Sequence, residues 1–153
     1  AGSGQGPRKW TKEEFKAAFV TAWSHVETFG IPWQLAYAVS ALETGNGNGQ
    51  VFQNSNNLFS ILASPSWKGP TYRGRPNSLT ANKAGDSHRV YPSLEASVSD
   101  WVRLMRIPHY ARAYAAALAN RPPLFFQELQ AAGYAGINKV YAQSLGRVYQ
   151  EVA

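Results

Sequence analysis

The chain has 153 residues, of which 44% are hydrophobic and 13% aromatic, so its length and composition predict a single globular domain with a substantial core. It has no cysteine and no apolar run near the ~20 residues of a membrane span, which excludes a disulfide framework, a thiolate zinc site and membrane insertion. A formal net charge of +6 favours an acidic partner, such as nucleic acid, an anionic membrane or an anionic cell-wall polymer.

The start of the chain carries no apolar signal-peptide core. We expect residues 1–9 to be a flexible leader or an expression remnant, and residues 10–153 to form the folded domain. The basic residues are scattered and form no dense block, so ordinary solvated faces account for most of them. We therefore expect no nucleic-acid partner.

A first helix is predicted to begin at Thr11, because Thr11 and Glu14 have the spacing of a capping box. An apolar stripe follows at helical spacing, and Gly30 is expected to end the helix. The stripe consists of Phe15, Ala18, Phe19, Ala22, Trp23, Val26 and Phe29.

A second helix is predicted from Pro32 to Glu43, since proline suits the first position of a helix. Gly45, which opens a loop rich in glycine and asparagine, is expected to end it. Apolar residues repeat at helical spacing in between: Leu35, Val39 and Leu42. Glu43 is therefore predicted to lie in the last turn of a mostly apolar helix.

This position is unfavourable for a negative charge, because the unpaired carbonyl groups at a helix C-terminus already carry partial negative charge. Apolar neighbours also raise the pKa of a carboxyl group by desolvation. A carboxylic acid that stays protonated near neutral pH can act as the general acid in glycoside cleavage. The alternative for Glu43, taken by itself, is a solvated glutamate at a helix end.

Amide side chains crowd the loop that leads to Asn57, and they suit either a sugar-binding wall or a plain surface loop. From Trp67 to Tyr91 helical periodicity is absent, and short β-prone pieces alternate with Gly, Pro, Asn and Ser. We predict a small β-hairpin lobe here.

Helices are predicted to resume at Ser93 and to continue to the end of the chain. One is expected to run up to Pro108, another to span Tyr110 to Leu118, and a short one to cover Leu124 to Ala132. The last is predicted to start near Ile137, with six apolar residues facing inward: Ile137, Val140, Tyr141, Leu145, Val148 and Val152. The expected fold class is α+β, predominantly helical, with one inserted β lobe.

Five sequence blocks occur in one order across nearly the whole domain, and together they resemble the family 73 glycoside hydrolases. This family of cell-wall glucosaminidases includes flagellar muramidase domains and has a lysozyme-like fold. The blocks are Ala41-Leu42-Glu43-Thr44-Gly45, Asn56-Asn57-Leu58-Phe59-Ser60-Ile61, Trp67-Lys68-Gly69-Pro70, His88-Arg89-Val90-Tyr91-Pro92-Ser93 with Ser99-Asp100, and Ala132-Gly133-Tyr134-Ala135 with Tyr141-Ala142.

The resemblance implies cleavage of peptidoglycan between N-acetylglucosamine and N-acetylmuramic acid, with the β lobe as one wall of the cleft. It implies that Glu43 is the general acid and that Tyr134 is a second catalytic residue, placed beside the reacting sugar. It also places Asn57 and Phe59 on the floor of the groove, Trp67 in its wall and Tyr141 among the substrate-binding residues. No metal or cofactor is expected.

The chain departs from the family pattern in its second carboxylate. Many members carry a glutamate in the β lobe, whereas this lobe contains only Asp86 between Lys68 and Val90. Three mechanisms remain: Asp86 as base of an inverting attack, participation of the substrate's own acetamido group, or a single acid with water held by Tyr134. We favour the last two. The family's Thr-Asp-Pro after the Gly-Tyr-Ala block is also replaced, by Gly136-Ile137-Asn138.

The expected partner is the glycan strand of peptidoglycan, and we expect a monomer acting in the periplasm or cell wall. The setting is either cell-wall remodelling or an antibacterial, bacteriolytic toxin. A toxin would require an inhibitor (immunity) protein in the producing cell. The alternative to an enzyme is a lysozyme-like module that binds glycan with little or no turnover.

Overall fold

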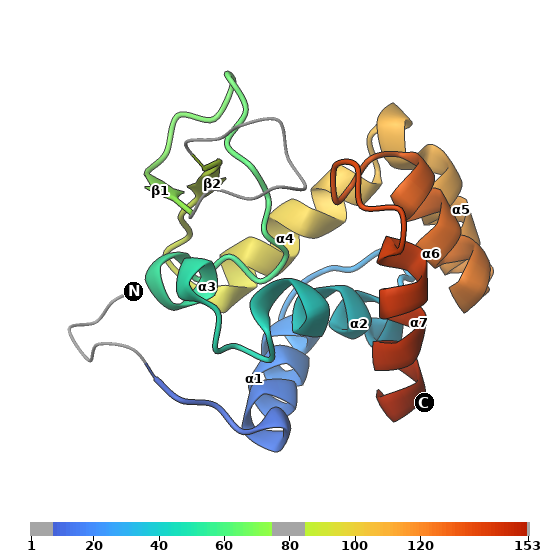
Figure 1. Ribbon diagram of the computed structural model, residues 1–153, viewed down its shortest axis with the longest axis horizontal. Helices are drawn as coiled ribbons and strands as arrows, with labels where there is room; N and C mark the ends of the chain where they lie inside the picture. The colour runs from blue at the N-terminus through green and yellow to red at the C-terminus, as the bar shows by residue number, and fades with distance from the viewer. Residues whose placement is uncertain (1–7, 75–84, 153) are drawn as a thin grey trace.

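The computed structural model describes residues 8–74 and 85–152. Most of this chain is helical, and a two-stranded β lobe projects from one side (Figure 1). The helices are α1 (Lys12–Ser24), α2 (Trp33–Thr44), α3 (Gln50–Ser55), α4 (Leu94–Met105), the 3₁₀ helix η1 (Pro108–Tyr110), α5 (Ala111–Leu118), α6 (Pro122–Ala131) and α7 (Tyr141–Val152), and the strands are β1 (Thr71–Arg73) and β2 (Ser87–Arg89). The predicted α+β class, predominantly helical, is confirmed. No helix in the described ranges is both long and apolar enough to cross a bilayer.

The predicted capping box starts α1. The Thr11 hydroxyl accepts a hydrogen bond from the Glu14 amide at 3.0 Å, and the Glu14 carboxylate accepts one from the Thr11 amide at 2.9 Å. The helix ends at Ser24 rather than at Gly30. The Glu27 carboxylate accepts a hydrogen bond from the Phe29 amide at 3.0 Å, and Phe29 adopts a left-handed conformation with φ 52°. Such a local side-chain bond offers the backbone an alternative to the helix.

Helix α2 lies at the centre of the fold, between α7 on one side and the segment that leads to the lobe (Figure 1). Most of its residues are buried, which fits its apolar composition. As predicted, Gly45 ends it in a left-handed conformation (φ 58°, ψ 47°), with its amide donating to the Ala41 carbonyl. Pro32 precedes the helix as its N-cap instead of occupying its first position.

The loop after α2 contains a helix, α3, that the sequence analysis did not predict. Only two of its residues, Phe52 and Ser55, are buried. A helix of six residues has too few turns to show an apolar stripe, and its asparagine and serine residues favour turns in isolation. Asn56 ends α3 in a left-handed conformation with φ 57°.

The β lobe forms as predicted. Strands β1 and β2 pair antiparallel, with Thr71 opposite Arg89 and Arg73 opposite Ser87. An isolated two-stranded hairpin is only marginally stable, so the lobe needs anchors to the helices. The Arg89 guanidinium provides one, because it donates to the Leu62 carbonyl and to the Asp100 carboxylate of α4, both at 2.9 Å.

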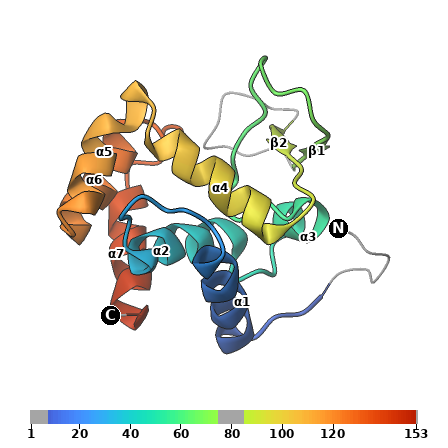
Figure 2. The same ribbon diagram turned by 180° about the vertical axis from the view of Figure 1, so that it is seen from behind.

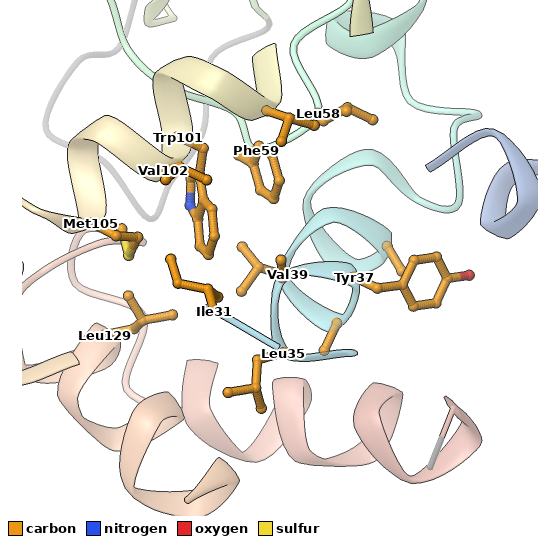
Figure 3. Packing of buried hydrophobic residues seen from close by; sticks show 14 of the residues in the cluster. Ile31, Leu35, Tyr37, Val39, Leu58, Phe59, Trp101, Val102, Met105 and Leu129 are labelled. Atoms are coloured by element: carbon orange, nitrogen blue, oxygen red, sulfur yellow. The ribbon is translucent and has the colours of Figure 1, made fainter. Parts of the chain in front are cut away.

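The core is built from buried residues of α1, α2, α4, α5, α6 and α7 and of the segment that follows α3, part of which is shown in Figure 3. The rings of Phe59 and Trp101 stack at 4.5 Å with an interplanar angle of 13°, and neither side chain has solvent exposure. Seen from behind, α4 crosses this side of the molecule (Figure 2). These two aromatic side chains therefore join α4 to the segment next to Glu43.

The last helix starts at Tyr141, later than predicted. Ile137 is 70% exposed and Val140 is 55% exposed, which corrects the prediction that both face inward. Gly133 and Gly136 adopt positive φ angles of 79° and 66°, so the chain turns after α6, where the predicted helix ends, and again just before the predicted start of the last helix. The predicted core positions Tyr141 and Leu145 are buried.

Candidate active site

Glu43 lies in the last turn of α2, as predicted, and its side chain is partly buried. The neighbouring residue Thr44 is buried, and its hydroxyl donates to the Ser40 carbonyl at 2.7 Å. The turn that carries Glu43 is thus held by α2 itself and by the Gly45 cap. Helix α2 is mostly buried, but its end reaches the surface at Glu43, so a polar side chain can be accommodated there.

Tyr141 is the closest polar partner of the Glu43 carboxyl group. Its hydroxyl donates a hydrogen bond of 2.6 Å to Glu43 Oε2, across a sequence separation of 98 residues. The Tyr141 side chain is only 2% exposed. The Ser60 hydroxyl is the second polar partner of this carboxyl group and, like Tyr141, favours its charged form. Two hydroxyl groups from distant parts of the chain therefore hold the carboxyl group at the end of α2.

Burial raises the pKa of Glu43 to about 7. Hydrogen bonds from Tyr141 and Ser60 oppose this rise, because both stabilise the carboxylate. The Ser60 hydroxyl lies 3.5 Å from the backbone carbonyl of Glu43 and close enough to the carboxyl group to affect its pKa. A pKa near 7 leaves a large fraction of Glu43 protonated at neutral pH, which is what a general acid requires.

Tyr134, the other predicted catalytic residue, lies beside Tyr141 but points elsewhere. Its hydroxyl donates to the Phe59 carbonyl at 2.7 Å, and its ring stacks on Tyr141 at 6.0 Å. Burial, followed by the charge of Glu43, raises the pKa of Tyr134 well above 10. In the described part of the chain the Trp101 indole N–H makes no hydrogen bond of ordinary geometry. It lies close enough to the Tyr134 hydroxyl, however, to oppose the rise in the pKa of Tyr134. Tyr134 thus supports Tyr141 and the Phe59 backbone.

Asn57 and Phe59 do not line a groove, which corrects their prediction as substrate-binding side chains. Both have 0% exposure. The Asn57 amide donates to the carbonyls of Ile61 and Arg89, both at 2.9 Å, and its oxygen accepts from the amides of Phe59 and Ile61 at 3.3 and 3.0 Å. These bonds use both polar atoms of the Asn57 side chain and join the segments of Ile61 and Arg89.

Trp67 belongs to a hollow of about 480 Å³ between the lobe segment and α4. The hollow is lined by Ser64, Ser66, Trp67, Arg89, Asp100, Arg103, Leu104 and Ile107. The Trp67 indole N–H donates to the Pro70 carbonyl at 2.9 Å, and the Arg89 guanidinium lies 4.9 Å from its ring. Tyr141 and Ser60, the groups that bond to Glu43, do not line this hollow.

Asp86 lies in the lobe, directly before β2. Its backbone carbonyl accepts from the Gly74 amide at 2.9 Å, and its charge acts on His88 of β2. Burial lowers the pKa of His88, while Asp86 opposes that effect. The partners of Asp86 are therefore in the hairpin itself. In residues 8–74 and 85–152 no three His, Cys, Asp or Glu side chains are grouped so that they could hold a metal ion.

The structure thus brings together Glu43, Tyr141, Tyr134 and Ser60. Ser60 was missed as a functional candidate, although it belongs to the Asn-Asn-Leu-Phe-Ser-Ile block. Its unusual backbone conformation, with φ 54°, turns the chain under the end of α2. Tyr110 was also missed; its ring meets Tyr134 edge to face at 5.9 Å.

Curated relatives match most of this chain. The peptidoglycan hydrolase FlgJ of Escherichia coli strain K12 is 37% identical over 131 residues, and that of Salmonella typhimurium is 35% identical over 134 residues. These alignments cover 80% and 82% of this chain but 41% of each relative. The chain therefore spans less than half the length of the curated relatives it matches.

Solved structures show the same fold. A peptidoglycan hydrolase from Sphingomonas sp. A1 superposes with a TM-score of 0.74 at 30% identity, covering 91% of this chain and 87% of that one. The glycoside hydrolase domain of Salmonella typhimurium FlgJ gives a TM-score of 0.68 at 31% identity, covering 94% and 89%. The family described as glucosaminidase (mannosyl-glycoprotein endo-beta-N-acetylglucosaminidase) matches residues 20–153. This chain therefore belongs to the glucosaminidase family of glycoside hydrolases, which confirms its resemblance to family 73.

Proposed function

We propose that this chain hydrolyses the β-1,4 bond between N-acetylglucosamine and N-acetylmuramic acid in peptidoglycan, with Glu43 as the general acid. The observation that carries the proposal is the Glu43 carboxyl group at the end of α2. Its pKa is about 7, and one of its oxygens is held by Tyr141 at 2.6 Å. The family match and the relatives named as peptidoglycan hydrolases support the substrate.

In the proposed reaction, Glu43 donates its proton to the glycosidic oxygen as the bond from that oxygen to the N-acetylglucosamine anomeric carbon breaks. The electron pair of the bond remains on the oxygen of the leaving muramic acid, which departs as an alcohol. Positive charge develops on the anomeric carbon, which forms a bond with the substrate's acetamido oxygen or with a water molecule. In the first case water then adds to the anomeric carbon and breaks the bond to the acetamido oxygen. In both cases the water leaves a hydroxyl group on that carbon, and its second proton is released to restore the acid form of Glu43 directly or through solvent. Tyr141 keeps a hydrogen bond to the Glu43 carboxylate that results, so the spent acid stays in place.

The products distinguish this bond from the other glycosidic bond of peptidoglycan. Purified sacculi are digested with the protein, the fragments are reduced with borohydride, and the sugar alcohols are identified by mass spectrometry. A glucosaminidase leaves N-acetylglucosamine at the new reducing ends, so N-acetylglucosaminitol is expected. N-acetylmuramitol above the undigested background would instead identify a muramidase. Binding to sacculi without any released fragment would support the glycan-binding module.

The two tyrosines allow a matched comparison, since each substitution by phenylalanine removes a single hydroxyl group. Tyr141→Phe removes the donor to Glu43, so we expect its activity on sacculi to fall by about 10-fold or more. It should also move the alkaline limb of the pH–rate profile upward, because the lost bond lowers the pKa of Glu43. Tyr134→Phe removes a bond to a backbone carbonyl, and a smaller loss is expected. A larger loss for Tyr134→Phe would restore the original assignment of Tyr134 as the catalytic tyrosine.

Asp86→Asn tests the second carboxylate. We expect a loss of less than about 10-fold, well below the ~100- to 10,000-fold that a general base supplies. The reason is that the partners of Asp86 in the structure, Gly74 and His88, belong to the lobe. The measurement is the initial rate of release of dye from labelled sacculi by the variant and the wild type. A loss as severe as that of a Glu43 variant would assign Asp86 as the base.

The setting follows from the substrate. Peptidoglycan is reached from the periplasm or the cell wall, and the formal charge of +6 favours adsorption to its carboxylates. A role as an antibacterial toxin predicts that a version exported to the periplasm lyses Escherichia coli, whereas a version kept in the cytoplasm is harmless. Co-expression with a cognate inhibitor would then protect the cells. Harmless expression in the periplasm would favour a remodelling enzyme.

A further inference from the structure

The segment before α1, residues 8–10, lies across the loop that follows the proposed acid, and we call this segment the N-terminal strap. It is held by two reciprocal amide pairs. Gln53 accepts a hydrogen bond from the Arg8 amide at 2.6 Å, and its side-chain amide donates back to the Arg8 carbonyl. Asn48 accepts from the Trp10 amide at 2.8 Å and donates back to the Trp10 carbonyl at 3.0 Å.

Arg8, which belongs to the predicted leader, is therefore packed against the domain. The same bonds give two amide side chains of the loop region, Asn48 and Gln53, partners within the protein. The amides of this region were candidates for a sugar-binding wall. Asn48 and Gln53 instead each accept from and donate to the backbone of one strap residue, as a neighbouring β-strand would. The Gln53 amide also donates to the Gly47 carbonyl at 2.6 Å, so it joins the strap to the loop. Asn48 and Gln53 are therefore engaged within the protein.

The Trp10 ring closes the strap over Gly47. It meets the ring of Phe15 edge to face at 5.9 Å, and the Arg8 guanidinium lies 3.7 Å from its centre. Gly47 has a positive φ of 87°, and a Cβ atom there would lie 2.7 Å from Phe15 and 2.9 Å from Trp10. The loop and the strap are thus packed as closely as a glycine allows.

The same loop completes the C-terminus of α2. The Gly47 amide donates to the Thr44 hydroxyl at 3.0 Å, and the Gly49 amide donates to the Thr44 carbonyl at 2.8 Å. The Asn46 amide donates to the Ala41 carbonyl at 3.0 Å. Carbonyl groups at a helix end need such partners, and without them the last turn frays. Glu43 lies in this turn, next to Thr44.

We propose that the N-terminal strap is a positioning device for Glu43, acting through the loop of residues 45–49 and the last turn of α2. The inference rests on the proposed role of Glu43 as general acid. Releasing the strap would loosen the loop, let the last turn of α2 move and admit water to the carboxyl group. The acid would then be both misplaced and more solvated.

The solvation of Glu43 gives a readout that a purely structural role would not change. Glu43 owes its raised pKa to burial, so a more solvated carboxyl group returns toward the ordinary value of 4.5. The other titratable groups that act on Glu43 are Tyr141 from α7 and Tyr134 from the segment before it, and neither bonds to the strap. Release of the strap should therefore move the alkaline limb of the pH–rate profile to lower pH.

The test is the double variant Asn48→Ala/Gln53→Ala, with Asn54→Ala as its matched control. Asn54 is an exposed amide of the same helix as Gln53, and its side chain bonds only locally, to the Gln50 carbonyl at 2.8 Å. The initial rate on labelled sacculi is measured from pH 4 to 9, and the melting temperature is measured in parallel. All assays run at least 10 °C below the lowest melting temperature.

We expect the double variant to lose about 10-fold in rate at pH 7 and to shift its alkaline limb downward, since small displacements of a catalytic group are costly. Asn54→Ala should match the wild type in both respects. A double variant that melts earlier but keeps the rate and the limb of the wild type would overturn the proposal and leave the strap with a structural role. If Glu43→Gln were itself active, the proposed function would fail instead, which separates the two outcomes.

Discussion

Glu43→Gln is expected to reduce the hydrolysis of peptidoglycan by at least ~100-fold while the fold is preserved. The amide has the shape of the acid and can still accept the hydrogen bond that Tyr141 donates at 2.6 Å. It cannot give a proton to the leaving glycosidic oxygen, however. The measurement is the release of reducing sugar from purified sacculi, compared with the wild type at equal concentration.

The pH dependence of the wild type follows from the same carboxyl group. With a pKa of about 7, the proton needed for catalysis is lost as the pH rises through 7, so the rate should fall on the alkaline side. The unfolded chain has the ordinary pKa of 4.5, so between pH 4.5 and 7 the folded state binds more protons than the unfolded state. The free energy of unfolding therefore decreases with rising pH across this window and loses no more from Glu43 above it.

Glu43→Gln removes this dependence because an amide does not titrate. At pH 8 we expect the variant to be about 2 kcal/mol more stable than the wild type, allowing for the partial exposure of the side chain. Below pH 4.5 the two proteins should unfold at the same denaturant concentration, since both side chains are then uncharged. Wild-type hydrolysis by this variant, or equal stability of the two proteins at pH 8, would show that Glu43 is not a buried general acid.

The helix that carries Glu43 could be predicted because its signals are local. The apolar repeat of Leu35, Val39 and Leu42 and the glycine at position 45 depend only on neighbours within a few turns. The capping box of Thr11 and Glu14 is local in the same way. By contrast, helix α3 could not be predicted from the pattern. Its amide side chains are held by distant parts of the chain, because Gln53 pairs with the Arg8 backbone and the Asn56 amide at its end donates to the Tyr91 carbonyl.

The site was only partly predictable for the same reason. Glu43 is marked by its own helix, whereas Tyr141 reaches it across 98 residues. The sequence shows Tyr134, Tyr141 and Tyr149 near the end of the chain but not which hydroxyl points at the acid. Asn57 shows the opposite error. It is a polar residue in one of the family blocks, so a sugar contact was predicted, whereas its side chain is buried. Its four hydrogen bonds all stay within the protein, and no short-range pattern shows this.

Asn57→Asp is expected to cost about 3–5 kcal/mol of stability, because it leaves a buried group without its partners. Asparagine and aspartate have nearly the same shape, so packing does not explain the effect. The amide at position 57 donates to the carbonyls of Ile61 and Arg89, both at 2.9 Å. An aspartate has no donor when ionised, and its charge would face two carbonyl oxygens at a position with 0% exposure.

The expected fall in melting temperature is about 10 °C at pH 7, since 1 kcal/mol corresponds to roughly 2–4 °C in a domain of this size. Asn54→Asp introduces the same charge on an exposed side chain, and we expect its stability to change by less than about 0.5 kcal/mol. The penalty for Asn57→Asp should shrink toward pH 4, because a protonated aspartate regains one donor and loses its charge. A variant that melts like the wild type at pH 7 would show that Asn57 is free to turn outward, as a sugar contact would require. Loss of stability on the predicted scale would place Asn57 among the residues that hold the lobe and the segment of Ser60 under Glu43.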